Sequence, residues 1–218
     1  PSLREVRTFA ETLSPDTREL CQAAWGAALV DNYSCGEAGP LALQCPDDPR
    51  HYHVASESVR LEVLDERNRP CVSGEIGRVV VTALHNFAMP LIRYELGDFA
   101  EVGPACSCGR SLPVLTRILG RKRNMLRIPD GRIVWPSIHF GPFSGNGKIR
   151  RFQLVQTGAS ALTLRLVVYT TLTGAESSAV REHLQQRLDY PFDIRIEYVD
   201  EIARADQKYE DVVSLLED

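Results

Sequence analysis

Alternating apolar and polar positions predict several β-strands in the first half of the chain. Val59 to Leu64 alternates as expected of a strand with one buried face. Arg78 to Thr82 is predicted to be another strand, and Ala28 to Val30 is a short apolar run that we interpret as a buried strand. Short strands are also expected within residues 91–118, around a loop that carries two cysteines. The pattern therefore predicts a β-rich first half within a mixed α/β and α+β chain.

Helical spacing is found before the first of these strands. A helix is predicted to begin at Pro15, because Ser14 can cap its amino end and proline fits the first helical position. Gly26 is expected to end it. The apolar positions of this helix predict one buried face, formed by Leu20, Cys21, Ala24 and Trp25.

The pattern changes after Gly120. Met125 to Ile128 and Arg132 to Trp135 flank a Pro-Asp-Gly turn and predict a hairpin. Two antiparallel strands, a helix and a last strand are predicted beyond it: Arg151 to Gln156, Leu162 to Tyr169, Ser177 to Leu188, and Ile194 to Val199. The helix should bury one face, formed by Val180, Leu184 and Leu188. We therefore predict two domains, residues 1–120 and 121–218.

The composition is ordinary for a globular protein and argues against several classes. The chain has 218 residues, of which 44% are hydrophobic and 25% charged. A net charge of −4 gives no general attraction to nucleic acid or to anionic lipid. No apolar run approaches membrane-spanning length, and the first residues do not resemble a signal peptide. With six dispersed cysteines, we expect a cytoplasmic protein with no nucleic-acid or membrane partner.

Two carboxylates lie in positions suited to nucleotide chemistry. The strand at Ala28 to Val30 is expected to lead into a polar turn, Asp31 to Glu37. Glu37 in this turn would hold Mg²⁺ beside phosphates or simply be solvated, the commoner case. Asp98 follows Gly97, which permits close approach, and its carboxylate can accept two ribose hydroxyls. The alternative for Asp98 is a turn residue paired with Arg93. Spacing alone leaves both interpretations open.

The cysteines offer a candidate metal site. Cys106 and Cys108 are one residue apart on a predicted turn, a weaker metal signal than Cys-x-x-Cys. A structural zinc ion needs about four ligands, and Cys45 with His51 or His53 would supply two more. The alternative is a pair of reduced loop thiols, which the spacing alone slightly favours.

Two basic features have ordinary alternatives. Arg121, Lys122 and Arg123 form a basic turn after Gly120, which can bind phosphate or ribose oxygens or remain a solvated cluster. Lys208 lies in the C-terminal tail, where a lysine is normally solvent-exposed. It would gain a role only if a small domain moved it onto a substrate.

The order of these features resembles a known family. The motifs are Tyr33-Ser34-Cys35-Gly36-Glu37, Gly74-Glu75-Ile76-Gly77-Arg78, Pro90-Leu91-Ile92-Arg93-Tyr94 with Gly97-Asp98, Cys106-Ser107-Cys108-Gly109-Arg110, Leu119-Gly120-Arg121 and Lys208-Tyr209. They are similar to the phenylacetate–CoA ligase-like branch of the adenylate-forming enzymes, which includes the CapK-type proteins. The resemblance runs over nearly the whole chain.

The resemblance implies a two-step reaction. A carboxylate attacks the α-phosphate of ATP in the presence of Mg²⁺, giving an acyl-adenylate and pyrophosphate, and a thiol, usually that of CoA, then takes the acyl group. A small C-terminal lid domain, here residues 121–218, rotates between the steps. The implied partners are a small carboxylic acid, for which an aromatic acid is one candidate, CoA or another acyl acceptor, and in some cases a second copy of the chain.

Site residues follow from the same resemblance. Tyr33 would line the adenine pocket and Glu37 would bind Mg²⁺. Asp98 and Arg121 would hold the ribose. Lys208 would neutralise charge that develops at the α-phosphate. The structural zinc set would be formed by Cys45, His53, Cys106 and Cys108.

Some positions depart from the family pattern. Gly36, at the nucleotide contact before the glutamate, stands where Ser or Thr is usual. Arg123 and Asn124 replace an acidic hinge, and Gln207 replaces a glycine before Lys208. These departures keep a non-catalytic nucleotide-binding or partner-binding homologue in view, beside an adenylate-forming enzyme with an amine or carrier-protein acceptor.

The family's Ser/Thr/Gly-rich phosphate loop is not found in these residues. The chain therefore resembles the C-terminal half of such an enzyme, and the missing N-terminal half is an expected partner. We expect the chain alone not to complete adenylation. The acyl pocket would lie mostly outside these residues, so they do not identify the acid.

Overall fold

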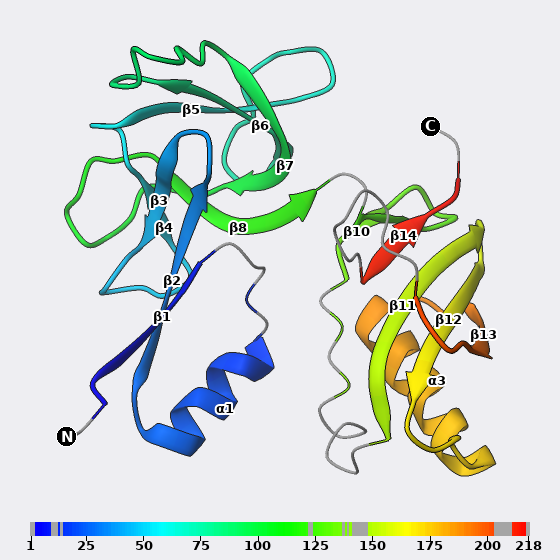
Figure 1. The fold of residues 1–218 in the computed structure, drawn as a ribbon. Coiled ribbons are helices and arrows are strands. Elements are labelled where there is room, and N and C mark those ends of the chain that lie inside the picture. Colours follow the sequence, from blue (N-terminus) through cyan, green and yellow to red (C-terminus); the bar gives the residue numbers. More distant parts are fainter. Residues whose placement is uncertain are drawn as a thin grey trace. The chain divides into compact units, whose positions relative to one another are not determined.

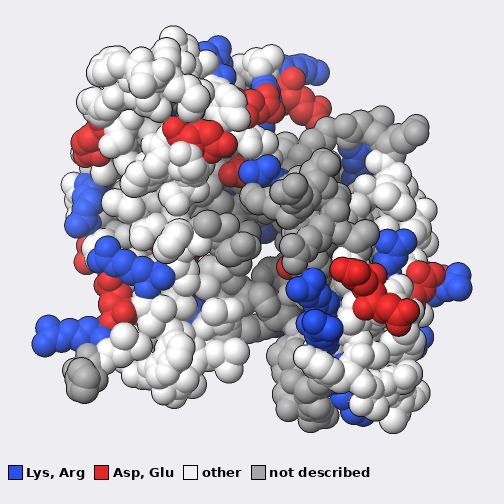
Figure 2. All heavy atoms as spheres, viewed as in Figure 1, with Lys and Arg blue, Asp and Glu red and all other residues white. Residues whose placement is uncertain are grey.

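The computed structural model describes residues 3–9, 13, 15–121, 124–136, 138, 140, 148–202 and 211–216. The chain divides into two compact units, Pro1–Lys122 and Arg123–Asp218. Each unit has its own sheet (Figure 1). Acidic and basic side chains are interspersed over the face of the molecule that Figure 2 shows. None of the helices in the described ranges is long and apolar enough to cross a membrane.

The first unit is built on an eight-stranded sheet of order β1-β2-β3-β4-β8-β7-β6-β5. Its strands are β1 (Glu5–Phe9), β2 (Ala28–Cys35), β3 (Gly39–Gln44), β4 (Tyr52–Val54), β5 (Val59–Leu64), β6 (Ile76–Ala83), β7 (Tyr94–Val102) and β8 (Val114–Arg121). Strands β1 and β2 are parallel and are joined through α1 (Pro15–Trp25), whereas every other pair in the sheet is antiparallel. The strands predicted at β5 and β6 are confirmed, while β1, β3 and β4 were not predicted.

Helix α1 has the predicted bounds but not the predicted buried face. Gly26 has a left-handed φ of 62° and its N–H bonds to the carbonyl of Gln22, so the glycine ends the helix as predicted. Cys21 is buried, but Leu20 and Trp25 are 66% and 61% exposed. The helix packs against β2 and buries Cys21. No other described element covers Leu20 or Trp25, so these two side chains remain exposed.

Strand β2 runs further than its apolar pattern predicted. Its buried positions alternate at Leu29, Asp31 and Tyr33, and the strand ends only at Cys35. Asp31 is buried because Thr8 and Tyr52 donate hydrogen bonds of 2.7 and 2.9 Å to its two carboxylate oxygens. A paired carboxylate therefore occupies a core position that the sequence pattern assigned to a turn.

The core of this unit lies among the strands of the sheet. Its buried members come from β2 to β8 and the segments beside them: Tyr33, Leu41, Ala42, Val54, Val59, Val63, Val79, Val81, Ala100 and Leu115. Strands β7 and β8 are nine and eight residues long, longer than the short strands predicted around the cysteine loop.

The second unit is a small α+β fold. Its four-stranded sheet has the order β13-β12-β11-β14, formed by β11 (Ile149–Gly158), β12 (Ala161–Val168), β13 (Asp193–Tyr198) and β14 (Val212–Ser214). Strands β9 (Leu126–Arg127) and β10 (Ile133–Val134) form the predicted hairpin. Helix α3 (Gly174–Leu188) covers the sheet through the predicted face of Val180, Leu184 and Leu188 (Figure 1).

Helix α3 begins three residues before its predicted start. Thr173 is the N-cap and forms a capping box with Glu176: the Thr173 hydroxyl accepts the Glu176 N–H, and the Glu176 carboxylate accepts the Thr173 N–H. The first turn carries no apolar residue larger than alanine, so the apolar spacing detected the helix only from its second turn.

Candidate nucleotide site and metal cluster

Three of the residues predicted to bind the nucleotide lie together in the sheet of the first unit. Asp98 in β7 and Arg121 at the end of β8 are register partners. The Tyr33 hydroxyl, from β2, donates a 2.8 Å hydrogen bond to Oδ2 of Asp98. The Nε of Arg121 lies 3.9 Å from Oδ1 of the same carboxylate. Side chains from three strands that are distant in the sequence are thus gathered around one carboxylate.

The cluster is chemically suited to hydroxyl recognition. Burial, and then the neighbouring Asp98 carboxylate, raise the pKa of Tyr33 far above its ordinary value, so its hydroxyl stays protonated and acts as a donor. The Asp98 side chain is 19% exposed, and Arg121 is 47% exposed. One Asp98 oxygen is thus anchored by Tyr33, while the other faces Arg121 and keeps lone pairs for a ligand.

The turn after β2 carries the predicted Mg²⁺ ligand. Gly36 and Glu37 are both exposed and belong to the turn between β2 and β3. The N–H of Ala38 donates to Sγ of Cys35 at 3.3 Å and helps to close this turn. Glu37 is therefore presented to solvent from a short, closed turn.

Several further predicted positions lie outside the described residues. They are Lys122 and Arg123 of the basic turn, Gln207, and Lys208, the predicted adenylation lysine. The alternative for Asp98, a turn residue paired with Arg93, is wrong. Asp98 lies within strand β7, and Arg93 instead lies 3.3 Å from the carboxylate of Glu62.

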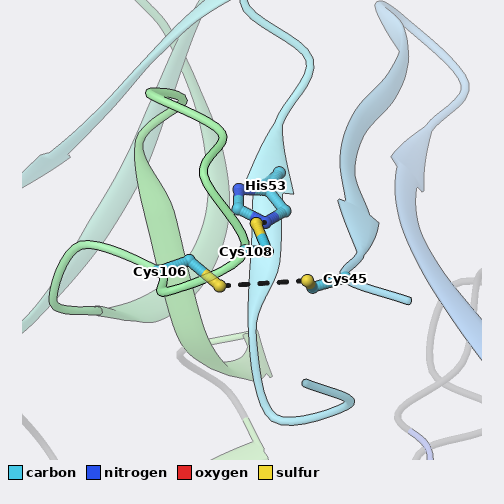
Figure 3. A group of neighbouring side chains, drawn as sticks. All are labelled: Cys45, His53, Cys106 and Cys108. Carbon is cyan, nitrogen blue, oxygen red and sulfur yellow. Dashed lines mark hydrogen bonds between the residues drawn. The ribbon is translucent and has the colours of Figure 1, made fainter. Parts of the chain in front are cut away.

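The Cys/His residues form one compact cluster. Cys45 follows β3, His53 lies in β4, and Cys106 and Cys108 lie in the loop between β7 and β8. The ligand atoms of these four residues all lie within 4.8 Å of one another. Figure 3 shows the three sulfur atoms and the imidazole ring turned towards one another. Antiparallel pairing of His53 with Val114 brings β4 beside β8 and so closes the cluster.

Two distances within the cluster are close to those of a tetrahedral zinc site. Zinc–sulfur bonds of about 2.3 Å at tetrahedral angles place two sulfurs about 3.8 Å apart. The Sγ atoms of Cys45 and Cys106 are 3.8 Å apart, too far for a disulfide. The Sγ of Cys108 lies 3.3 Å from Nε2 of His53, near the roughly 3.6 Å expected of a sulfur–nitrogen pair on one zinc ion. A set of three thiols and one imidazole is among the common structural zinc sets.

The backbone of the cysteine loop acts on the ionisation of its two thiols. The N–H of Cys108 lowers the pKa of Cys106, and the N–H of Arg110 lowers the pKa of Cys108. Gly109 takes a φ of 83°, a left-handed conformation that glycine adopts without strain. The Arg110 N–H, followed by its guanidinium, lowers the pKa of Cys108 to about 6. The loop therefore favours the thiolate of Cys108, the form that binds metal, whereas burial and the neighbouring thiols raise the pKa of Cys106.

His53 turns one ring nitrogen towards the cluster. Its side chain is buried, and Nε2 is the nitrogen that faces Cys108. Nδ1 has no hydrogen-bond partner among the described residues. Coordination of a metal through Nε2 would place the ring proton on Nδ1 and leave that nitrogen still without a partner.

Sequence reasoning missed several supporting residues. Asp31 was assigned to a polar turn, yet it joins β1, β2 and β4 through Thr8 and Tyr52. His51 was considered only as an alternative ligand, and its Nδ1 lies 3.2 Å from the Cys106 sulfur. Adjacency to predicted ligands was the one signal that could have singled out His51 and Arg110.

Comparison with solved structures defines the class of the fold. The chain matches a 2-hydroxyisobutyryl-CoA ligase in the postadenylation state over 95% of its length, with a TM-score of 0.69 and 24% identity. It matches an anthranilate CoA ligase in complex with anthranoyl-AMP over 93% of its length, with a TM-score of 0.66 and 18% identity. It covers 48% and 41% of those chains. The fold is thus that of about half of an adenylate-forming CoA ligase, although this half is mostly β-sheet.

Sequence comparison narrows the relationship. The chain is 32% identical over 140 residues to the phenylacetate–coenzyme A ligase of Thermus thermophilus, and 29% identical over 139 residues to that of Escherichia coli. Each match covers 62% of this chain and 31% of the relative. No family model matches the chain. The chain is a homologue of the phenylacetate–coenzyme A ligases over their C-terminal portion, which confirms the predicted resemblance.

Proposed function

We propose that this chain supplies the nucleotide-binding residues and the lid of an ATP-dependent, AMP-forming ligase. The ligase adenylates a small carboxylic acid, with aromatic acids among the candidates, and transfers the acyl group to CoA. The observation that carries this proposal is the cluster of Tyr33, Asp98 and Arg121, in a homologue of phenylacetate–CoA ligases. In this proposal residues 1–120 belong to the large adenylation domain and residues 121–218 form the lid.

Each residue has a defined task in the proposed site. Tyr33 fixes the Asp98 carboxylate through its hydroxyl, while its ring is buried in the core of the sheet and not open to the adenine. Asp98 accepts hydrogen bonds from the ribose hydroxyls, and Arg121 donates to the ribose oxygens. Glu37 holds Mg²⁺ at the exposed turn between β2 and β3. The neighbouring Gly36 has no side-chain hydroxyl to offer to the phosphates.

The reaction can be tested in the full-length protein that contains this chain. Pyrophosphate release is measured with a panel of carboxylic acids, with and without CoA. We expect release to depend on particular acids and an acyl-CoA to form when CoA is present. Adenylation without acyl-CoA would instead favour an amine or carrier-protein acceptor. No release with any acid, and no thermal shift with ATP, would favour a non-catalytic homologue.

Lys208 carries the proposed adenylation step. A cation placed at the α-phosphate stabilises charge that develops in the transition state. Lys208→Ala in the same protein should therefore slow adenylation by about 10²-fold or more. An adenylation rate equal to that of the wild type would show that Lys208 has no such role.

We further propose that Cys45, His53, Cys106 and Cys108 bind a structural zinc ion. Such an ion would fasten the end of β3 and the β7–β8 loop to β4, because its ligands come from those three segments. The four ligands fill a tetrahedral shell, so the ion would have no open position for catalysis.

Elemental analysis of purified protein tests the zinc proposal. We expect about one equivalent of zinc, and removal with a strong chelator should lower the melting temperature. Less than a tenth of an equivalent would contradict the proposal, since a structural site is normally filled. Val72→Ser, an exposed surface change in the same unit, serves as a control that should keep its zinc.

A further inference from the structure

Two cationic or donor side chains contact the sulfurs of the Cys/His cluster without belonging to it. The Nδ1 of His51 lies 3.2 Å from Sγ of Cys106. The Arg110 guanidinium interacts with Cys108, and this interaction raises the pKa of the guanidinium. The two contacts fall on different sulfurs, and they come from two loops: His51 directly precedes β4, and Arg110 ends the cysteine loop.

An aspartate lies beside each of these side chains. Nη1 of Arg110 donates to Oδ2 of Asp47 at 3.5 Å. Oδ2 of Asp48 lies 3.8 Å from Nδ1 of His51, but this is the same nitrogen that contacts Cys106, and one ring N–H serves one acceptor. The Asp48 carboxylate accepts hydrogen bonds from Arg50 instead, at 2.9 and 2.8 Å.

The backbone of the loop fixes His51 in place. The N–H of Cys45 donates to the carbonyl of His51 at 2.7 Å, and the N–H of His51 donates to the carbonyl of Asp48 at 3.0 Å. The His51 side chain is 14% exposed, so it is already largely ordered. Arg110 is 47% exposed and keeps its guanidinium partly in water.

Charge explains why such donors are needed. Three thiolates and one neutral imidazole around Zn²⁺ leave a net negative charge on a largely buried site. Burial of uncompensated charge is unfavourable, and hydrogen bonds to the ligand sulfurs spread that charge. Partners of metal ligands also fix ligand orientation, and their loss typically weakens metal affinity by about 10–100-fold.

We propose that His51 and Arg110 are positioning residues of the zinc site, which donate hydrogen bonds to the Cys106 and Cys108 thiolates and so strengthen the binding of zinc. The proposal rests on the zinc site proposed above. It assigns Asp47 the task of orienting Arg110. It also assigns the two histidines different tasks: His53 of β4 binds the metal, and His51 of the preceding loop supports a ligand.

Zinc affinity, measured by competition with a chromophoric chelator, tests the proposal. The variants are His51→Ala and Arg110→Ala, each with a conservative partner. His51→Asn keeps an N–H near the position of Nδ1, and Arg110→Lys keeps the charge. We expect both alanine variants to bind zinc at least about 10-fold more weakly. The asparagine and lysine variants should recover part of that loss.

Arg117→Ala is the matched control for Arg110→Ala. It removes the same charge from a residue that pairs with Glu101 at 3.4 Å, and it should leave zinc affinity unchanged. Circular dichroism at saturating zinc shows whether each variant is folded. The Co²⁺-substituted protein supplies a second readout, because sulfur-to-cobalt absorption bands should shift in the alanine variants and not in Arg117→Ala.

Three outcomes would overturn the proposal. Alanine variants with zinc affinity within about twofold of wild type would show that the donors do not support the ligands. Loss of zinc in His51→Ala, with retention of one equivalent in His53→Ala, would make His51 the ligand. Wild-type protein without zinc would refute the zinc site itself, and is recognised before any variant is compared.

Discussion

At the scale of single residues, the account centres on Asp98. Its carboxylate is anchored on one oxygen by the buried Tyr33 hydroxyl, and its other oxygen faces Arg121. Because burial holds the pKa of Tyr33 far above its ordinary value, its hydroxyl remains a hydrogen-bond donor on the alkaline side of neutral pH. The carboxylate is thus held in one orientation before any ligand arrives, which lowers the entropic cost of binding.

Tyr33→Phe should reveal the strength of this anchor. The variant removes a hydroxyl that donates to a charged acceptor, and we expect a loss of about 1.5–3 kcal/mol in the free energy of unfolding. Urea denaturation measures that loss. Tyr94→Phe is the control, because Tyr94 is 40% exposed and should change stability by less than about 0.5 kcal/mol. Equal stability of the two variants would contradict the anchoring role of Tyr33.

Some of the site residues could be found from the local sequence, and others could not. The resemblance located Asp98, Arg121 and the four Cys/His positions, because they lie in recognisable motifs. Spacing alone could not separate the two interpretations of Asp98, since the deciding partner, Tyr33, lies in a strand that is distant in the sequence. Asp31 was misassigned for the same reason: its partners Thr8 and Tyr52 make a buried carboxylate acceptable, and neither is local.

At the scale of elements, an ion pair and a capping box stabilise the first turn of helix α3. Glu176 accepts a 2.6 Å hydrogen bond from Nζ of Lys148 as well as the N–H of Thr173. Lys148, and then Thr173, lower the pKa of Glu176 from its ordinary 4.5 to about 2. The carboxylate therefore ties the helix start to the residue that precedes β11.

The depressed pKa of Glu176 predicts a dependence of stability on pH. Because the folded pKa is lower than the unfolded one, the stabilisation is present above pH 4.5 and is lost as the pH falls towards 2. Glu176→Gln should flatten this acid-side decline, as measured by thermal unfolding from about pH 6 to about pH 2. Glu182→Gln, on the same helix, is the control and should keep the wild-type slope. Identical slopes for all three proteins would contradict the assignment.

Strand β6 carries a glycine, Gly77, at a point where the backbone of β5 and the Cys71 side chain pass close to it. A Cβ on Gly77 would lie 2.4 Å from the carbonyl oxygen of Leu64 and 2.6 Å from the Cys71 sulfur. Gly77→Ala must therefore displace backbone of β5, and we expect a loss of about 1–3 kcal/mol. Gly36→Ala is the matched control in the same unit, since its Cβ would meet nothing within 4 Å. Chemical denaturation that shows equal stability for the two variants would contradict the packing described.

Strand prediction succeeded where each strand had one polar and one apolar face. It identified β5, β11 and β12 from their own alternation, and α3 from three apolar positions. It missed β4, which has three residues and lies in a stretch with the composition of a loop. That strand is specified by its partners β3 and β8, not by its own sequence, and it carries the candidate ligand His53.

At the scale of the first unit, strand β8 links its two candidate sites. It begins at Val114, the register partner of His53, and ends at Arg121, the register partner of Asp98. Eight residues of strand span about 25 Å, so the zinc ligands do not reach the nucleotide residues. The proposed metal therefore acts on the nucleotide site only by holding strands in place.

The most direct test of the central claim is AMP binding by Asp98→Ala in the full-length protein, measured by isothermal titration calorimetry. Loss of a carboxylate that accepts ribose hydroxyls should weaken AMP binding by at least about tenfold. Glu101→Ala removes the same charge from the same strand, where its carboxylate pairs with Arg117, and should bind AMP as the wild type does. If wild type, Asp98→Ala and Glu101→Ala bind AMP equally, the assignment of Asp98 to the nucleotide site is wrong.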